Sequence, residues 1–180
     1  MHFTQRIRRA SGRDRIRSVP AGEDKQRANK SPHPSEPPLR GAALAARLLV
    51  GACVPESGDP LRLEVVRTLA RDLAEELEAL EVLDDATATV EGALRAADVA
   101  NLAACIAPEL LETAATRASA AAYLAAGAAR ALGILADTAV GDAHEEPRGE
   151  YEQNLSKDAR GAVWRAQLAV RQVDEFMETG

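Results

Sequence analysis

The sequence predicts an all-α protein, an alanine-rich bundle of about five helices that follows a disordered N-terminal tail. Apolar residues recur at alternating spacings of three and four in several long segments, which is the period of one helix face. No segment of useful length alternates apolar and polar residues as a strand does. Aromatic residues make up only 3% of the chain, so the predicted core consists mainly of alanine, leucine and valine.

The first 35 residues differ in composition from the rest of the chain. Residues 1–40 contain ten Lys and Arg against four Asp and Glu, and residues 1–35 contain few apolar side chains. Such a segment buries too little surface to offset the entropy of ordering, so we predict a disordered, solvated tail. Other interpretations stay open: a basic recognition site at "RIRRAS", a transit peptide, a segment upstream of the native start, or a nucleic-acid arm. The arm would use Arg6, Arg8, Arg9, Arg13, Arg15 and Arg17.

Residues 36–180 are predicted to form a single domain, because this length suits one hydrophobic core. The first helix is expected to run from Ser35, a capping-type residue, to Val54, which a proline follows. The next helix has the clearest signals, with Asp59 as its N-cap and Pro60 in its first turn. Its apolar seam, flanked by charged residues as in a coiled coil, comprises Leu63, Val66, Ala70, Leu73, Leu77 and Leu80.

A third helix is expected from about Asp85 to Ile106, and a long alanine-rich helix over residues 110–140. One apolar line of the alanine-rich helix comprises Ala114, Ala118, Ala121, Ala125, Ala128, Leu132, Leu135 and Ala139. A second line, on a neighbouring face, comprises Leu110, Thr113, Arg117, Ala120, Leu124, Gly127, Ala131 and Ile134. A helix that is apolar over so much of its circumference must be surrounded, and alanine lets neighbouring backbones approach closely. We therefore predict that this helix is the enclosed centre of the bundle.

The last helix is expected to begin near Ser156, after a loop over residues 141–154. Its apolar seam comprises Ala159, Val163, Ala166, Val170, Val173 and Met177. Arg160, Arg165 and Arg171 are expected to face outward, because they lie off this seam.

Charge and cysteine usage favour a cytoplasmic protein. Residues 41–180 contain twelve Lys and Arg against twenty-four Asp and Glu, which disfavours nucleic acid as a partner of this acidic body. Cys53 and Cys105 lie in apolar helical patterns without a CxxC pair, so we expect two buried free thiols. Arg47 and Arg130 interrupt the longest apolar runs, so no membrane span is predicted, and the N-terminus lacks the features of a secretory signal.

The chain lacks the motifs of the common catalytic sites. It contains three histidines, no Glu-x-x-His pair, no GxSxG motif and no phosphate-binding glycine loop. Two acidic clusters contain residue types that can ligate a metal ion. The first cluster comprises Glu75, Glu76 and Glu78. It lies beside the leucine seam, where charged residues are ordinarily solvated. The second cluster comprises His144, Glu145, Glu146 and Glu150. It lies in the expected loop, which lacks the fixed geometry that metal ligation usually needs. We name no catalytic, cofactor-binding or metal-ligating residue.

Several single residues are unusual for their positions. Asn101, near Asp98, lies in an apolar helix, where a lone amide more often fixes helix pairing than contacts a ligand. Arg117 and Arg130 are expected to pair with carboxylates of the second helix. Trp164 is expected to be a core or rim residue, with an anchor for a partner as the alternative.

The absence of catalytic motifs and the strong apolar seams favour a non-enzymatic bundle that acts through protein contacts. It would serve as an adaptor, an immunity or regulatory factor, or a self-associating subunit. The alternative is a small helical enzyme that uses carboxylate-bound Mg²⁺ on a phosphorylated substrate, which requires acidic residues of two helices to converge. A third hypothesis, nucleic-acid binding, rests on the basic tail alone.

Overall fold

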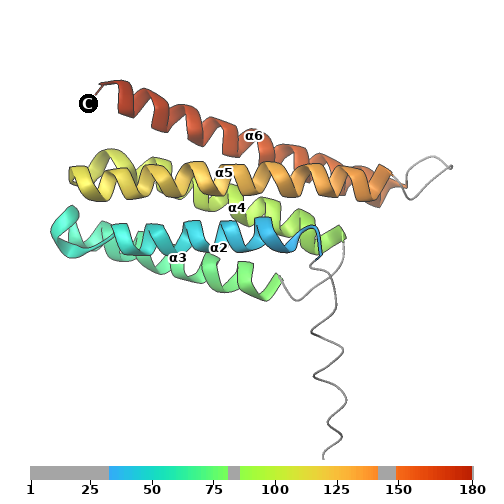
Figure 1. The fold of residues 1–180 in the computed structure, drawn as a ribbon, viewed down its shortest axis with the longest axis horizontal. Coiled ribbons are helices and arrows are strands. Elements are labelled where there is room, and N and C mark those ends of the chain that lie inside the picture. The colour runs from blue at the N-terminus through green and yellow to red at the C-terminus, as the bar shows by residue number, and fades with distance from the viewer. Residues whose placement is uncertain (1–32, 81–85, 142–148, 180) are drawn as a thin grey trace, which may run out of the picture. The chain divides into compact units, whose positions relative to one another are not determined.

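The computed structural model describes residues 33–80, 86–141 and 149–179, and within these ranges it is an all-α bundle without strands, as predicted (Figure 1). Its α-helices are α2 (Glu36–Ala52), α3 (Pro60–Leu80), α4 (Ala86–Ile106), α5 (Glu112–Gly141) and α6 (Glu150–Thr179). Two 3₁₀ turns, η1 (Pro55–Ser57) and η2 (Ala107–Glu109), lie between α2 and α3 and between α4 and α5. Disorder was predicted for residues 1–35. Residues 1–32 of this segment lie outside the described ranges.

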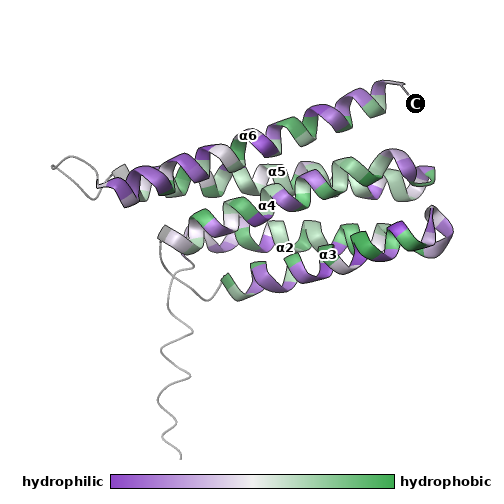
Figure 2. Cartoon of the chain, turned by 180° about the vertical axis from the view of Figure 1, so that it is seen from behind, coloured by the Kyte–Doolittle hydropathy of each residue, from purple (hydrophilic) through white to green (hydrophobic). Residues whose placement is uncertain are grey.

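The helices enclose one main aliphatic core. Helix α5 packs against α2, α4 and α6, whereas α3 packs against α2 and α4. In Figure 1, α5 accordingly lies between α6 and α2, with α3 on the far side of α2. Seen from behind, α6 is largely hydrophilic and α5 largely apolar (Figure 2). The largest fully buried apolar side chains are Leu39, Leu49, Leu77, Val99, Leu132 and Val173.

The predicted cap of α3 is confirmed, but that of α2 is wrong. The Asp59 carboxylate accepts a hydrogen bond from the backbone N–H of Leu61 at 3.1 Å, which satisfies a donor of the first turn. The Ser35 hydroxyl makes no cap bond, because it lies 2.7 Å from Nδ1 of His33 instead. In η1, the Ser57 hydroxyl donates to the carbonyl of Ala52 at 2.9 Å and thereby satisfies the end of α2.

The predicted seam of α3 faces the core. Leu63, Val66, Ala70 and Leu77 are buried, and Leu73 and Leu80 are half-buried. These side chains are spaced so that they lie along one stripe of the helix. Their burial stabilises the packing of α3 on its neighbouring helices.

Helix α5 is central, but the prediction that it is enclosed is only half right. The first predicted line is buried from Ala114 to Leu132, but Leu135 is half-buried and Ala139 is exposed. The second predicted line is mostly exposed, including Leu124 and Ile134, of which 36% and 58% is accessible. The prediction failed because this line consists mainly of small or polar residues. Small or polar side chains have little apolar surface, so burying them gains little free energy even where they fit an apolar pattern.

Two glycines mark points where helices approach closely. A Cβ atom at Gly92 of α4 would lie 2.5 Å from Cδ2 of Leu39 and 3.3 Å from Cδ1 of Leu132. A Cβ atom at Gly133 of α5 would lie 2.5 Å from Cγ2 of Val163 in α6. The contacts of α4 and α6 with their neighbours therefore depend on small residues, as the alanine content suggested.

The expectation that no segment is long enough to span a membrane is wrong. Within the described residues one stretch, Glu112–Ala139, is long and apolar enough by length and composition. Half of the 18-residue window that passes this test is buried in the bundle, and the core helix of a soluble protein passes the same test. Alanine explains the result, because its mild hydrophobicity adds up over many residues despite the charge of Arg130.

Helix α6 begins at Glu150, so the predicted loop is wrong for residues 150–154. Ser156, near which the helix was expected to begin, is a buried residue within it, and its hydroxyl donates to the Asp137 carboxylate of α5. The polar composition of residues 150–154 hid the helix, because these residues face solvent rather than the core. The predicted seam of α6 is buried or half-buried except at Met177, of which 55% is exposed.

The two cysteines are free thiols, as expected, but only Cys53 is buried. Burial raises the pKa of the Cys53 thiol above its ordinary value, while the positive charge of Arg67 opposes this effect. Cys105 is exposed, because it lies on the outer side of α4, and the prediction that it is buried is wrong.

Candidate protein interface

The outer side of α5 carries apolar side chains that no described helix covers. We call the exposed line of this helix the α5 outer stripe; it comprises Thr113, Thr116, Arg117, Ala120, Tyr123, Leu124, Gly127, Arg130 and Ile134. In Figure 1 this helix lies between α6 and α2. Helices α2, α4 and α6 pack against the other faces of α5 and leave the α5 outer stripe exposed.

A groove runs between the α5 outer stripe and α6. It has a volume of about 480 Å³, and most of its lining surface is apolar. We call it the α5/α6 groove; it is lined by Tyr123, Ala126, Gly127, Arg130, Gln167, Val170 and Arg171. Small residues on α5 make the groove possible, because Gly127 has open space where a side chain would stand.

The groove contains two arginines without counter-ions. Within the described ranges, neither Arg130 nor Arg171 has an ion-pair partner, although the body of the protein is strongly acidic. The expectation that Arg117 and Arg130 pair with carboxylates of α3 is therefore wrong; α3 does not pack against α5. The outward orientation predicted for Arg171 holds. Two guanidinium groups at an apolar groove favour an anionic partner surface.

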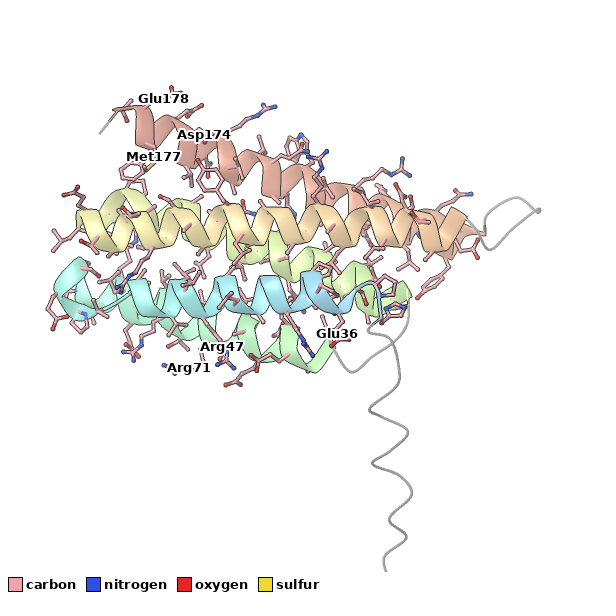
Figure 3. The ribbon with its side chains drawn as sticks, viewed as in Figure 1. Glu36, Arg47, Arg71, Asp174, Met177 and Glu178 are labelled. Atoms are coloured by element: carbon pink, nitrogen blue, oxygen red, sulfur yellow. The ribbon has the colours of Figure 1, made fainter. Side chains whose placement is uncertain are left out.

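Tyr123 is fixed at the edge of the groove. Its hydroxyl donates a hydrogen bond to the Asp174 carboxylate of α6. Figure 3 shows Asp174 near the C-terminal end of that helix. This hydrogen bond, followed by burial and the negative charge of Asp174, raises the pKa of Tyr123 above its ordinary value. The bond also ties α6 to α5 beside the groove. Asp174 keeps its negative charge in this bond, but among the described residues it forms no ion pair with either groove arginine.

A second exposed apolar surface lies on α3. We call it the α3 row: Leu61, Val65 and Leu69, which follow one another at intervals of four residues. The accessible fractions of these three side chains are 82%, 60% and 47%. Asp72 continues the same face, seven residues after Val65, and Glu75 follows one turn later. Neither carboxylate has an ion-pair partner among the described residues.

The α3 row was not predicted. Its signal was present, because three large apolar residues recur at a spacing of four outside the predicted seam. The convergence of Arg130 with Arg171 could not be found in this way. It depends on how α5 and α6 are placed against each other, which the sequence pattern does not give.

An ion-pair chain accounts for several other residues. Arg165 of α6 lies 3.0 Å from Asp98 of α4, and Arg95 lies 3.9 Å from Asp98 and 2.6 Å from Glu76 of α3. Arg165 is therefore half-buried in a contact between helices rather than free in solvent, contrary to the prediction. Asn101 is half-buried on α4, and its role in helix pairing stays a prediction.

Two of the three carboxylates in the acidic cluster of α3 are engaged in ordinary surface ion pairs, and Glu75 is exposed without one among the described residues. Glu78 lies 2.5 Å from Arg47 of α2, and Glu76 belongs to the ion-pair chain. No group of three His, Cys, Asp or Glu side chains that could hold a metal ion occurs in the part of the chain that the structure describes. His144, Glu145 and Glu146 of the second cluster lie outside it, and Glu150 is the exposed first residue of α6.

Trp164 lies on the outside of α6 and is 61% exposed, so the expectation that it is a core or rim residue is wrong. The alternative, an anchor for a partner, is consistent with this position. Trp164 does not line the α5/α6 groove.

Comparisons with protein-family models, with curated proteins and with solved structures find no match for this chain.

Proposed function

We propose that this protein is a non-enzymatic helical bundle that works by binding a protein surface through the α5/α6 groove. The observation that carries the proposal is the combination of an apolar floor with Arg130 and Arg171, which have no counter-ions within the described residues. An isolated exposed apolar residue needs no explanation, whereas a contiguous patch is typical of interaction sites. Arginine is also enriched at such sites, because it pairs with carboxylates while packing on apolar surface.

The alternative of a magnesium-dependent enzyme has no observation in its favour. It requires carboxylates from two helices at one point, and the described residues offer no such group. The groove itself is lined by cations and apolar side chains rather than acids. We further propose that the protein acts in the cytoplasm, because the exposed Cys105 is a free thiol.

Site-specific photocrosslinking tests the proposed function. A photoreactive amino acid at Gly127, inside the groove, is expected to form a covalent adduct with a protein in the native cell. The matched control places the same group at Lys157, an exposed residue of α6 that does not line the groove. Protein adducts from position 127 but not from position 157 support the proposal. Equal labelling at both positions, or no adduct at either, contradicts it.

A further inference from the structure

We infer that the partner of the α5/α6 groove is a second copy of this chain, whose α3 row lies in the groove. The inference rests on the proposed function and specifies its partner. It begins from charge. The groove presents Arg130 and Arg171, and the row is followed by Asp72 and Glu75, all without ion-pair partners among the described residues. Each surface therefore supplies the charges that the other lacks.

The apolar parts of the two surfaces also complement each other. The groove floor consists of small or short side chains, including Ala126, Gly127 and Val170. The α3 row projects three larger side chains, which repeat at about 6 Å along the helix axis. An apolar row of this spacing, set into a groove between two helices, is a common mode of helix recognition.

One molecule cannot bury its own row in its own groove. Helix α3 packs against α2 and α4, whereas the groove lies between α5 and α6. Figure 1 shows α2 and α5 between α3 and α6. The contact must therefore join two copies through different surfaces. A single contact of this kind leaves one free groove and one free row, so the pair either closes through a second, reciprocal contact or adds further copies.

A complementation experiment tests this geometry with the full-length protein. The groove variant carries Arg130→Glu and Arg171→Glu, and the row variant carries Leu61→Ser and Val65→Ser. All four altered side chains are exposed, so both variants are expected to fold. Size-exclusion chromatography with light scattering is then used to measure mass over a range of concentrations.

We expect the wild type to form assemblies larger than the 19.1 kDa chain and each variant alone to remain monomeric. An equimolar mixture of the two variants is expected to form a species of about twice that mass. The intact row of the groove variant can still bind the intact groove of the row variant, and this pair cannot grow further. A control with Arg117→Glu and Lys157→Glu changes the net charge equally outside the groove and is expected to assemble like the wild type.

Four results would overturn the inference. A wild type that is monomeric at every concentration excludes the second copy. A mixture that stays monomeric shows that the contact does not join a row to a groove. Assembly of either variant alone places the interface elsewhere. A photocrosslink from Gly127 to a different protein would also overturn the inference, while the proposed function would stand.

Discussion

Replacing Ala125 by leucine tests whether α5 is the tightly packed centre of the bundle. Ala125 has no accessible surface, and it belongs to a line of buried alanines that faces the neighbouring helices. Leucine adds three carbon atoms where no space is available, so the side chains or backbones around it must shift. Overpacking of this kind costs about 1–3 kcal/mol of the free energy of unfolding.

Ala120 provides the matched control, because it lies on the same helix but is exposed on the α5 outer stripe. Alanine and leucine have similar helix propensities, so Ala120→Leu is expected to change stability by about 0.5 kcal/mol or less. Urea unfolding followed by circular dichroism gives both free energies. In thermal unfolding, the Ala125 variant should melt about 2–12 °C below the control. If Ala125→Leu is as stable as Ala120→Leu, α5 is not closely packed and the account of the core is wrong.

Three further predictions concern other parts of the molecule. Gly133→Ala is expected to destabilise the protein by about 1–3 kcal/mol, because its Cβ would clash with Val163; adding Val163→Ala should recover most of the loss in a double-mutant cycle. A thiol reagent at pH 8 is expected to modify Cys105 rapidly and Cys53 only slowly, since burial both shields Cys53 and raises its pKa; equal rates would contradict this. Asp98→Ala should cost less than about 1 kcal/mol, because the ion-pair chain is partly exposed; a loss of several kcal/mol in urea unfolding would contradict that view.

The parts of the fold that depend on large apolar side chains were predictable. The seam of α3 was identified residue by residue, because burying leucine and valine stabilises the protein far more than leaving them in water. The cap by Asp59 was predictable for a local reason, since the aspartate and the backbone donor it satisfies are two residues apart.

Small residues misled the prediction, because they fit a buried or an exposed position almost equally well. Alanine at position 121 is buried and alanine at position 120 is exposed, yet both belong to predicted apolar lines. The start of α6 was missed for a related reason: residues 150–154 are polar and pack little surface, so no apolar period marked them as helical.

The candidate interface was only partly predictable. Contacts through protein surfaces were expected in general, and the spacing of Leu61, Val65 and Leu69 could have indicated one of those surfaces. The groove could not have been found, because its two arginines are 41 positions apart in the chain and meet only through the packing of α5 on α6.

A mixed disulfide between two copies is the sharpest test of the contact between the α3 row and the α5/α6 groove. One chain carries Val65→Cys and the other carries Gly127→Cys, and both carry Cys105→Ser so that no other exposed thiol remains within the described residues. We expect mild oxidation of the mixture to join position 65 of one copy to position 127 of the other, as identified by mass spectrometry. A control pair with Lys157→Cys in place of Gly127→Cys should form this bond far more slowly. Equal rates for the two pairs, or no bond between positions 65 and 127, would contradict the proposed contact.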